Sequence, residues 1–483
     1  MRKLIITLSA VLILAMPLAA QDLETGYFLG GNPYAFRMNP AFQSERNIIS
    51  IGLGMTGAGV QSNLGISTFL YPDASGNHLY TFLNDHVPAS DVMRKLKRKN
   101  YIDADVFANL LTVGFWAERN FFTIDVNFRS HEAVSLPYDL FRFVKGGKAQ
   151  GDVYECGRMG FQTINYAEAA IGWSRTFGDL FQVGVRSKFI MGALASSVRM
   201  DRLKVTVGED HWGIESRGSL TVSSPAVRVN NQEGSANLDP QSFSIDTERI
   251  KPAGWGGAID LGFSWNVIPL LTLSGAILDL GAVRWNREIQ YATPESVYNW
   301  SPSSEEEENP AGEYGEEWLD LVQVAASFLC WEPVLGKGAA FELQPFRVHA
   351  GAEFRMPFYD RLSVGALYQG RFTGSFGRHT GRFSVNWNPF DMLSLSTSLA
   401  LNRFGESMGL ALNFHPAGIN LVLGCDYIPF RCVDLSPLLG DEAQAYRSYA
   451  RFPKGQVKMD VYLGLNIAFG RRRVDHGKRF LSK

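Results

Sequence analysis

The chain has 483 residues, of which 46% are hydrophobic and 12% aromatic, and its formal net charge is -2. A charge so close to zero excludes partners such as nucleic acids that are recruited by bulk charge. Four cysteines are too few for a disulfide scaffold in a chain of this length, although Cys425 and Cys432 flank a loop and fit either a disulfide or two free thiols.

Residues 1–20 have the layout of a secretory signal peptide. The segment begins with two basic residues, continues with an apolar run and ends in two alanines. We expect cleavage after Ala20 and export of the mature chain from the cytoplasm. No later stretch has the roughly eighteen unbroken apolar residues of a membrane-spanning helix, so the mature protein, if integral to a membrane, has to be a β-barrel.

Residues 21–46 precede the first expected strand and contain Asn39-Pro40-Ala41, where the Asn-Pro pair favours a turn. Five aromatic side chains in this segment would be exposed if it trailed into solvent. They are Tyr27, Phe28, Tyr34, Phe36 and Phe42. We therefore expect residues 21–46 to form a hatch-like segment inside or across the mouth of a barrel, with Asn39, Pro40 and Ala41 as its motif.

Several motifs around and after this box resemble a known family. They are Ile48–Gly54, Ser62–Gly65, Phe69–Pro72, Asn109–Phe115 and Leu136–Phe141. Together with the Asn-Pro-Ala box, they resemble a family of Bacteroidota outer-membrane β-barrels of unknown function. That family is similar in architecture to the long-chain fatty-acid transporter type of barrel, whose N-terminal segment folds into the lumen as a hatch. The resemblance implies a fold and a membrane location, and it implies no particular substrate.

Two helices are expected in the first half of the chain. Asp85–Asn100 has apolar residues at helical spacing among five basic ones, and Leu136–Phe143 is a shorter candidate. The basic helix fits either a solvated helix in a long loop or an amphipathic helix on anionic lipid headgroups. In the insert 193–254, the alternating pieces Leu203–Val207 and Leu220–Val229 predict a hairpin outside the membrane.

Most of the remaining chain reads as consecutive strands. In Arg361–Arg371, apolar side chains alternate with polar or small ones, as the two-residue period of a strand requires. Short turns join similar pairs, which are Leu110–Ala117 with Phe121–Ser130, Tyr166–Phe177 with Phe181–Gly192, and Trp255–Asn266 with Leu270–Gly281. Long polar inserts are expected at 57–109, 131–165, 193–254 and 282–346.

This pattern predicts an all-β fold, a single transmembrane antiparallel β-barrel of about 14 strands over residues 47–470, followed by a polar tail at 471–483. Short turns would share one end with both termini, and long loops would share the other. A soluble sandwich gives no reason for that segregation. Because bacterial barrels keep short turns periplasmic and long loops outside, we expect the protein in the cell outer membrane.

The last expected strand, Lys458–Gly470, is apolar on one face and would close the sheet against Ile48–Met55. An apolar final strand with an aromatic near its end resembles the signal that outer-membrane barrels present to their assembly machinery. The partners implied are therefore outer-membrane lipid and the barrel-assembly machinery.

The sequence has no linear motif for catalysis. The glycines 52, 54 and 57 have the spacing of a dinucleotide fingerprint, but a β-branched run follows where the fingerprint needs a helix. The acidic run Glu305–Glu308 is expected to be a solvated loop rather than a cation site. We therefore predict that the protein is not an enzyme and has no catalytic residue, metal or cofactor.

Charged residues at lumen-facing positions are the candidate site. They are Asp125, Arg129, Glu168, Arg186, Lys188, Asp260, Glu353, Arg355, Arg382 and, on the last strand, Asp460. Two interpretations remain. The charges either pair with one another, because an isolated ion out of water is costly, or select a solute.

Two functions fit such a barrel. It passes or binds a small hydrophobic solute, or it is a structural or accessory barrel whose long loops hold a cell-envelope or secretion partner. The glycines 52, 54, 57 and 59 near the first strand indicate either a bend where a lateral opening forms or close packing.

Overall fold

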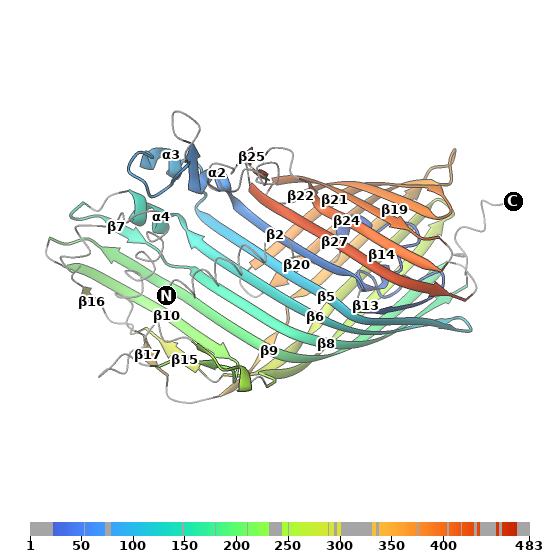
Figure 1. Ribbon diagram of the computed structural model, residues 1–483, viewed down its shortest axis with the longest axis horizontal. Coiled ribbons are helices and arrows are strands. Elements are labelled where there is room, and N and C mark those ends of the chain that lie inside the picture. Colours follow the sequence, from blue (N-terminus) through green and yellow to red (C-terminus); the bar gives the residue numbers. More distant parts are fainter. Residues whose placement is uncertain are drawn as a thin grey trace, which may run out of the picture.

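The computed structural model is a closed antiparallel β-barrel of 14 strands, which confirms the predicted fold class (Figure 1). It describes residues 23–470 except 53, 73–78, 147–148, 179, 210, 231–243, 250, 288, 294–296, 301–330, 335–337, 374–375, 403–404, 417, 429–431, 435–450 and 454–455. The signal peptide, the C-terminal tail, the acidic run Glu305–Glu308 and the side chain of Cys432 lie outside the described residues.

The wall strands follow one another around the ring in chain order. They are β1 (Asn47–Ile51) with β2 (Thr56–Gly65), β5 (Lys99–Ala117), β6 (Asn120–Pro137), β8 (Met159–Phe177), β9 (Phe181–Thr206), β13 (Gly254–Ile268), β14 (Leu271–Asn286), β19 (Phe346–Arg355), β20 (Leu362–Thr373), β21 (Phe376–Phe390), β22 (Leu393–Asn402), β23 (Gly405–Phe414), β24 (Ile419–Ile428) and β27 (Gln456–Phe469). The ring closes where β27 pairs with β1 at Asn47↔Phe469 and with β2 at Thr56↔Leu463.

The two ends of the barrel differ in their connections, as predicted. Short turns after β5, β8, β13, β19, β21 and β23 lie at the end that carries Asn47 and Phe469, which we name the turn end. The longer connections lie at the opposite end, the loop end (Figure 1). The asymmetry is that of a transmembrane barrel.

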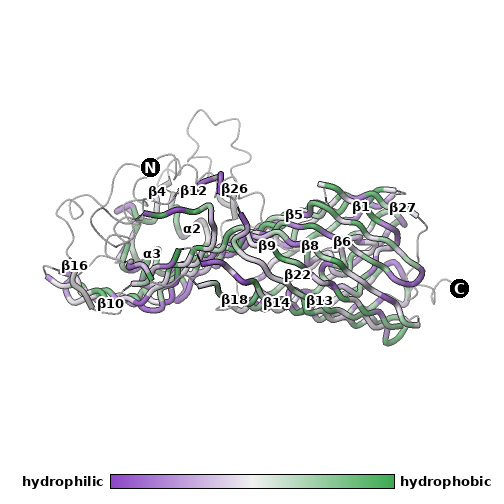
Figure 2. Tube along the Cα trace, turned by 90° about the horizontal axis from the view of Figure 1, so that it is seen from below, coloured by the Kyte–Doolittle hydropathy of each residue, from purple (hydrophilic) through white to green (hydrophobic). Residues whose placement is uncertain are grey.

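Exposed apolar side chains form a band on the outside of the wall. Hydrophobic and hydrophilic residues alternate along the wall strands (Figure 2). Along β20, Val364 and Tyr368 are exposed whereas Ser363 and Gln369 are buried, as the alternation predicts. Exposed Trp255 and Trp265 stand near the two ends of β13. With a rise of about 3.3 Å per residue and a tilt of about 40°, they are separated by roughly 25 Å in height, which is the thickness of the apolar band of a membrane barrel. This band makes the barrel a transmembrane one.

The first wall strand is interrupted near Gly52, one of the glycines at which the sequence indicated either a bend or close packing. Both β1 and β2 pair with β27 on one side and β5 on the other, so they occupy one place in the wall. Between them Gly52 has a φ of 71°, a conformation that favours glycine. The expected single strand Ile48–Met55 is therefore wrong in extent, because the wall bends at Gly52 and continues as β2 up to Gly65.

The wall strands also run further past the loop end than expected. Strand β9 has 26 residues and forms a hairpin with β10. The predicted pieces Leu203–Val207 and Leu220–Val229 do not pair with each other, because Leu203 lies opposite Ser216 and Leu220 lies opposite Val198. The inserts 57–109, 131–165, 193–254 and 282–346 are accordingly shorter than predicted. The remaining strands are β3 (Leu70–Pro72), β4 (Leu79–Thr81), β7 (Val153–Glu155), β10 (Trp212–Ser223), β11 (Val227–Arg228), β12 (Ser244–Ile245), β15 (Ile289–Ala292), β16 (Val297–Trp300), β17 (Glu332–Pro333), β18 (Ala339–Leu343), β25 (Cys432–Asp434) and β26 (Arg451–Pro453).

This extension has its own apolar core. One face of β7, β9, β10 and β15 is buried with Phe143 and Trp331, and Cys156 lies in the same cluster. Burial raises the pKa of the Cys156 thiol to about 12. The extension is thus a packed sheet, and Cys156 is a structural thiol rather than a reactive one.

The helices are short. They are α2 (Ile66–Phe69), α3 (Ala89–Met93), α4 (Tyr138–Lys145), η1 (Glu24–Gly26), η2 (Ala35–Arg37) and η3 (Thr247–Arg249). The predicted helix Asp85–Asn100 is wrong beyond α3, because Lys99 already pairs with Pro137 at the start of β5. No helix in the described part of the chain is long and apolar enough to cross a membrane.

Candidate functional site

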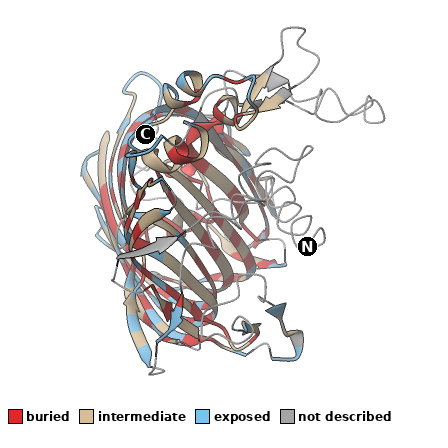
Figure 3. Ribbon diagram, turned by 90° about the vertical axis from the view of Figure 1, so that its left-hand side faces the viewer, coloured by how far each residue is buried: buried red, intermediate tan, exposed pale blue. Residues whose placement is uncertain are grey.

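The N-terminal segment, residues 23–46, lies in the lumen and contacts several strands of the wall. Its aromatic side chains Tyr27, Tyr34 and Phe36 are buried. The Tyr34 hydroxyl donates to the carbonyl of Leu465 on β27 at 2.9 Å, and the Nδ2 of Asn39 donates to the carbonyl of Phe263 on β13 at 3.0 Å. Seen from the loop end, buried and less buried residues alternate along the wall strands (Figure 3). The segment therefore occupies the space that an open pore would need.

The start of this segment is fixed by a buried charged cluster, which we name the Arg382 latch. It consists of Glu24 and Thr25 with Arg382 on β21, Ser398 on β22 and Asp426 on β24. The backbone N–H groups of Glu24 and Thr25 donate to the Asp426 carboxylate at 2.8 and 2.6 Å. Arg382 donates to Glu24 Oε2 at 3.0 Å and to Thr25 Oγ1 at 2.8 Å, and lies 3.1 Å from Asp426 Oδ1. Charge-assisted bonds of this kind are stronger than neutral ones, so the latch ties the segment to three wall strands.

The Asn-Pro-Ala box packs against wall positions without side chains. Asn39 Oδ1 accepts the N–H of Ala41 at 3.0 Å, which closes a tight turn. A Cβ at Gly184 on β9 would lie 2.0 Å from the Pro40 carbonyl oxygen, and one at Gly262 on β13 would lie 2.1 Å from Asn39 Oδ1. The box therefore approaches the wall more closely than it could if residues 184 and 262 were of any type other than glycine.

Six of the predicted lumen residues form one connected group, the Lys188 network. Arg186 on β9 contacts Asp125 on β6 at 2.9 Å and Asp260 on β13 at 3.1 Å. Lys188 contacts Asp260 at 2.8 Å and Asp279 on β14 at 2.5 Å. The predicted Arg129 and Glu168 pair with each other at 3.2 Å, and Asn127 bonds both Glu168 and Arg37 of the N-terminal segment. Paired charges of this kind offset their desolvation, as the structural interpretation requires.

The other predicted residues lie elsewhere. Arg382 belongs to the latch, and Asp460 accepts the backbone N–H of Asp426 beside it. Glu353 and Arg355 line a cavity of about 540 Å³ at the turn end, between the N-terminal segment and the wall. The Ser363 hydroxyl donates to Glu353 there at 2.6 Å.

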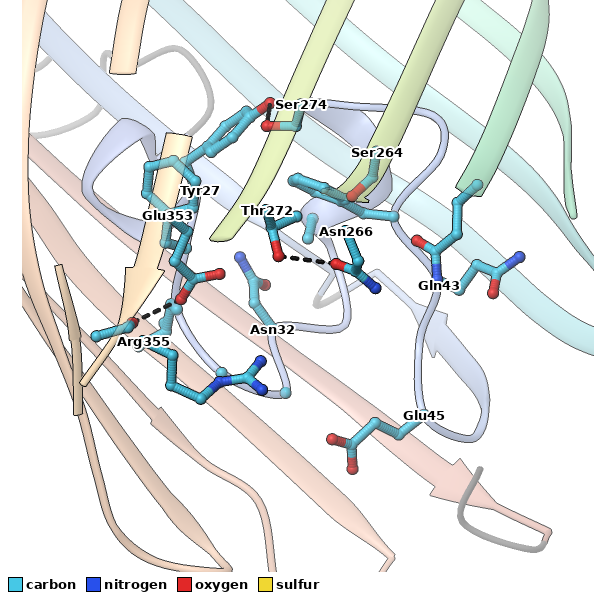
Figure 4. A pocket seen from close by; sticks show the side chains of 18 of the residues that line it. Tyr27, Asn32, Gln43, Glu45, Ser264, Asn266, Thr272, Ser274, Glu353 and Arg355 are labelled. Atoms are coloured by element: carbon cyan, nitrogen blue, oxygen red, sulfur yellow. Dashed lines mark hydrogen bonds between the residues drawn. The ribbon is translucent and has the colours of Figure 1, made fainter. Parts of the chain in front are cut away.

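This cavity is mostly polar (Figure 4). From the N-terminal segment it is lined by Tyr27, Asn32 and Glu45, and its wall side includes the Thr272 hydroxyl, which donates to Asn266 at 2.8 Å. Hydroxyl, amide and charged groups converge on it, so it can hold water or a polar group but offers no continuous apolar surface.

An apolar cluster lies behind the interruption of the first strand. Met55, at that interruption, is buried against Phe107 on β5 and Tyr462 on β27. The N-terminal segment contributes Leu23, Leu29 and Tyr34 to the same cluster. Asn109 fills the wall at this level, because its Nδ2 donates to the Leu111 carbonyl at 3.0 Å and a Cβ at Gly54 would clash with its side chain. The lumen is thus apolar where the wall is least regular.

Several residues of these clusters were not predicted. Asp279 has a φ of 62° and sits where the register of β13 and β14 shifts, which resets the alternation used to assign faces. Arg347 contacts Asp279 at 2.8 Å and was not assigned to the lumen. Glu24 and Asp426 were also missed, although Asp426 carries the one ionised side chain of strand β24, a signal that could have identified it.

Together, these features define a transmembrane β-barrel whose lumen is occupied by its own N-terminal segment. The chain belongs to a family of unknown function, DUF5723, whose model matches residues 40–426. That match agrees with the expected membership of a barrel family without an assigned activity.

Some solved structures are similar to the chain at low identity. A deltaS2S3 mutant of the monoaromatic hydrocarbon channel TodX has a TM-score of 0.42 at 10% identity, covering 90% of this chain and 94% of that chain. The toluene transporter TbuX of Ralstonia pickettii has a TM-score of 0.41 at 9% identity, covering 90% of this chain and 94% of that chain. A FadL homologue of Pseudomonas aeruginosa has a TM-score of 0.40 at 12% identity, covering 94% of this chain and 99% of that chain. No curated protein matches the chain.

Proposed function

We propose that the protein is an outer-membrane channel that admits a small hydrophobic solute and that residues 23–46 act as its hatch. The observation that carries the proposal is the apolar cluster of Met55, Phe107 and Tyr462 directly behind the interrupted first strand. An apolar solute gains free energy by entering such a surface, whereas the charged networks elsewhere in the lumen repel it.

The route follows from which residues of the cluster belong to the N-terminal segment and which belong to the wall. Leu23, Leu29 and Tyr34 belong to the N-terminal segment, so a shift of that segment removes three of the eight residues of the cluster and leaves a chamber. The chamber adjoins the strand interruption at Gly52, where the wall has no regular ladder. Entry beside Gly52 would let an apolar solute pass from the membrane into the lumen without crossing the Lys188 network.

The test compares uptake of an apolar fluorescent compound by a deletion strain that carries either the wild-type protein or Met55→Glu. A carboxylate at position 55 is costly in this cluster and should reduce uptake to the level of the deletion strain. Met55→Leu keeps the apolar volume and serves as the matched control. Uptake that is equal in the wild type and the deletion strain would refute a transport function.

A second function has one observation in its favour. The sheet of β7, β9, β10 and β15 stands beyond the membrane band with its own core, and a channel does not require it. An accessory barrel that holds an envelope partner would use such a surface. A stoichiometric partner recovered with the solubilised barrel, together with unchanged uptake in the deletion strain, would favour this function over transport.

A further inference from the structure

Five charged or titratable side chains meet near the loop end of the lumen, in a group of ion pairs that includes no residue of the latch or the Lys188 network. They are Asp103 and Asp105 on β5, His131 on β6, Arg371 on β20 and Arg378 on β21. Arg371 binds Asp105 through both terminal nitrogens, at 2.9 and 3.0 Å. Arg378 donates to Asp103 at 3.1 Å, and His131 Nδ1 lies 2.9 Å from Asp105 Oδ1. We name this group the cross-lumen clasp.

The clasp joins opposite sides of the barrel. Around the ring, six strands separate β5 from β20 in one direction, namely β6, β8, β9, β13, β14 and β19. Six strand positions also separate them in the other direction, namely β1 with β2, β27, β24, β23, β22 and β21. Ion pairs between neighbouring strands line a lumen, whereas these pairs cross it.

The distances require the barrel to be narrow at this level. A circular 14-stranded barrel is roughly 28 Å wide, from a strand spacing of about 4.8 Å and a tilt of about 40°. An arginine and an aspartate in contact bridge no more than about 12 Å between their Cα atoms. The two walls therefore approach each other at the clasp, and the closed part of the tube narrows toward the middle of the molecule (Figure 2).

The clasp borders a small enclosed space. A cavity of about 40 Å³ is lined by Asp105, His131 and Arg371 together with Arg129 and Arg347. Ile164 on β8 lines the same cavity and pairs with His131 across the strands. The side chains of Asp105, His131, Arg371 and Arg378 are only 8–12% exposed. The clasp is therefore largely shielded from solvent.

We propose that the cross-lumen clasp is an outer gate, which closes the loop end of the barrel independently of the N-terminal segment at the turn end. The proposal rests on the proposed channel function for its physiological use. The closure itself does not depend on that function, because opposite walls held by two arginine–aspartate pairs can part only when both pairs break. Truncating one partner leaves a buried charge uncompensated and favours the parted state.

The experiment measures access to the cavity from outside the cell. All four cysteines (156, 330, 425 and 432) are replaced by serine, and Ile164→Cys is introduced as the only thiol. Intact cells then receive a sulfonated, membrane-impermeant methanethiosulfonate. We expect slow modification with the clasp intact and roughly tenfold faster modification in Arg371→Gln/Arg378→Gln, corresponding to about 1.4 kcal/mol of gate opening.

Two controls separate the gate from a general loosening. Arg361→Gln removes an arginine at the turn end and should leave the modification rate unchanged. The exchange Asp105→Arg/Arg371→Asp restores a pair across the lumen and should return the slow rate. Heat-modifiable gel mobility establishes that each variant is folded, and if the double glutamine variant does not fold, Asp103→Asn/Asp105→Asn is measured in its place.

The outcomes distinguish this proposal from the transport function. A modification rate that is the same with and without the clasp would overturn the outer gate, whatever uptake shows. Faster modification with restoration by the exchanged pair would establish the gate, and apolar uptake measured in the same cells would then decide separately whether the barrel transports.

Discussion

Glycine positions in the wall decide how closely the Asn-Pro-Ala box can approach it. Gly184 faces the Pro40 carbonyl, which is backbone and cannot rotate away as a flexible side chain would. The absence of a Cβ is therefore what permits this contact, and the box explains why an inward-facing position on β9 carries glycine.

We predict that Gly184→Val displaces the N-terminal segment. Overpacking of this kind costs about 1–3 kcal/mol, and here the weaker partner is the segment rather than the hydrogen-bonded wall. Trypsin should cut the solubilised variant after Arg37 or Arg46 much faster than the wild type. The control is Gly381→Val, because a Cβ at Gly381 meets nothing within 4 Å. Equal cleavage rates in both variants would show that the contact does not hold the segment.

At the residue scale, the alternation of strands predicted most of the lumen charges and failed where the alternation itself changes. Asp125, Arg186 and Lys188 are buried at the positions where the alternation placed them, and Asp260 is buried beside a register shift. Asp279 follows a register shift, and no local sequence signal gives the phase after it. Which charges pair depends on distances across the lumen, and a single strand does not contain that information.

The wall strands show how much an element can be predicted without its neighbours. The last strand was assigned correctly, since Val461, Leu463 and Ile467 face outward and the strand pairs with β1. The helix Asp85–Asn100 was overextended, because pairing of Lys99 with Pro137 on β6 outweighs local helical spacing. Likewise, loop boundaries were placed where polarity begins, whereas β9 continues as a strand beyond the membrane.

The apolar band leads to a prediction about outward-facing positions on these strands. Val364→Arg on β20 and Leu463→Arg on β27 each place a cation against lipid, which destabilises membrane barrels by roughly 2–4 kcal/mol at mid-membrane. Ser363→Arg is the matched control one residue away, because it can reach the polar cavity beside Glu353. Urea unfolding in lipid vesicles measures the difference. An equal loss of unfolding free energy for substitutions on both faces would contradict the assignment of a lipid-facing band.

Two different kinds of contact fill the lumen of the barrel at different levels. At the loop end, opposite walls bind each other through the cross-lumen clasp, whereas lower in the lumen the wall binds the N-terminal segment through the Arg382 latch. The segregation of short turns to one end and long loops to the other predicted the barrel and which of its ends carries the turns. It could not predict either closure, because each joins residues that are hundreds of positions apart in the chain, such as Thr25 and Asp426.

The latch has an excess of carboxylates around one guanidinium, which makes Arg382 its central residue. Glu24, Asp426 and Asp460 lie near Arg382, and Asp460 also accepts two backbone N–H groups of β24. Removing the arginine leaves buried carboxylates without a counter-charge, a change that typically costs 3–5 kcal/mol. The strain is relieved most easily if Glu24 and its segment leave the lumen.

We therefore predict that Arg382→Gln releases the N-terminal segment while the wall stays folded. In planar bilayers, all proteins are compared in an Arg371→Gln/Arg378→Gln background, which opens the cross-lumen clasp. The protein with Arg382 intact should show no steady conductance there, and the variant should show open events that resemble those of a protein lacking residues 23–46. Arg361→Gln, which removes an exposed pair with Asp391, should behave as the background protein. If Arg382→Gln remains as silent as the background protein although the shortened protein conducts, then the segment is held by its apolar contacts with Met55, Phe107 and Tyr462 rather than by the latch.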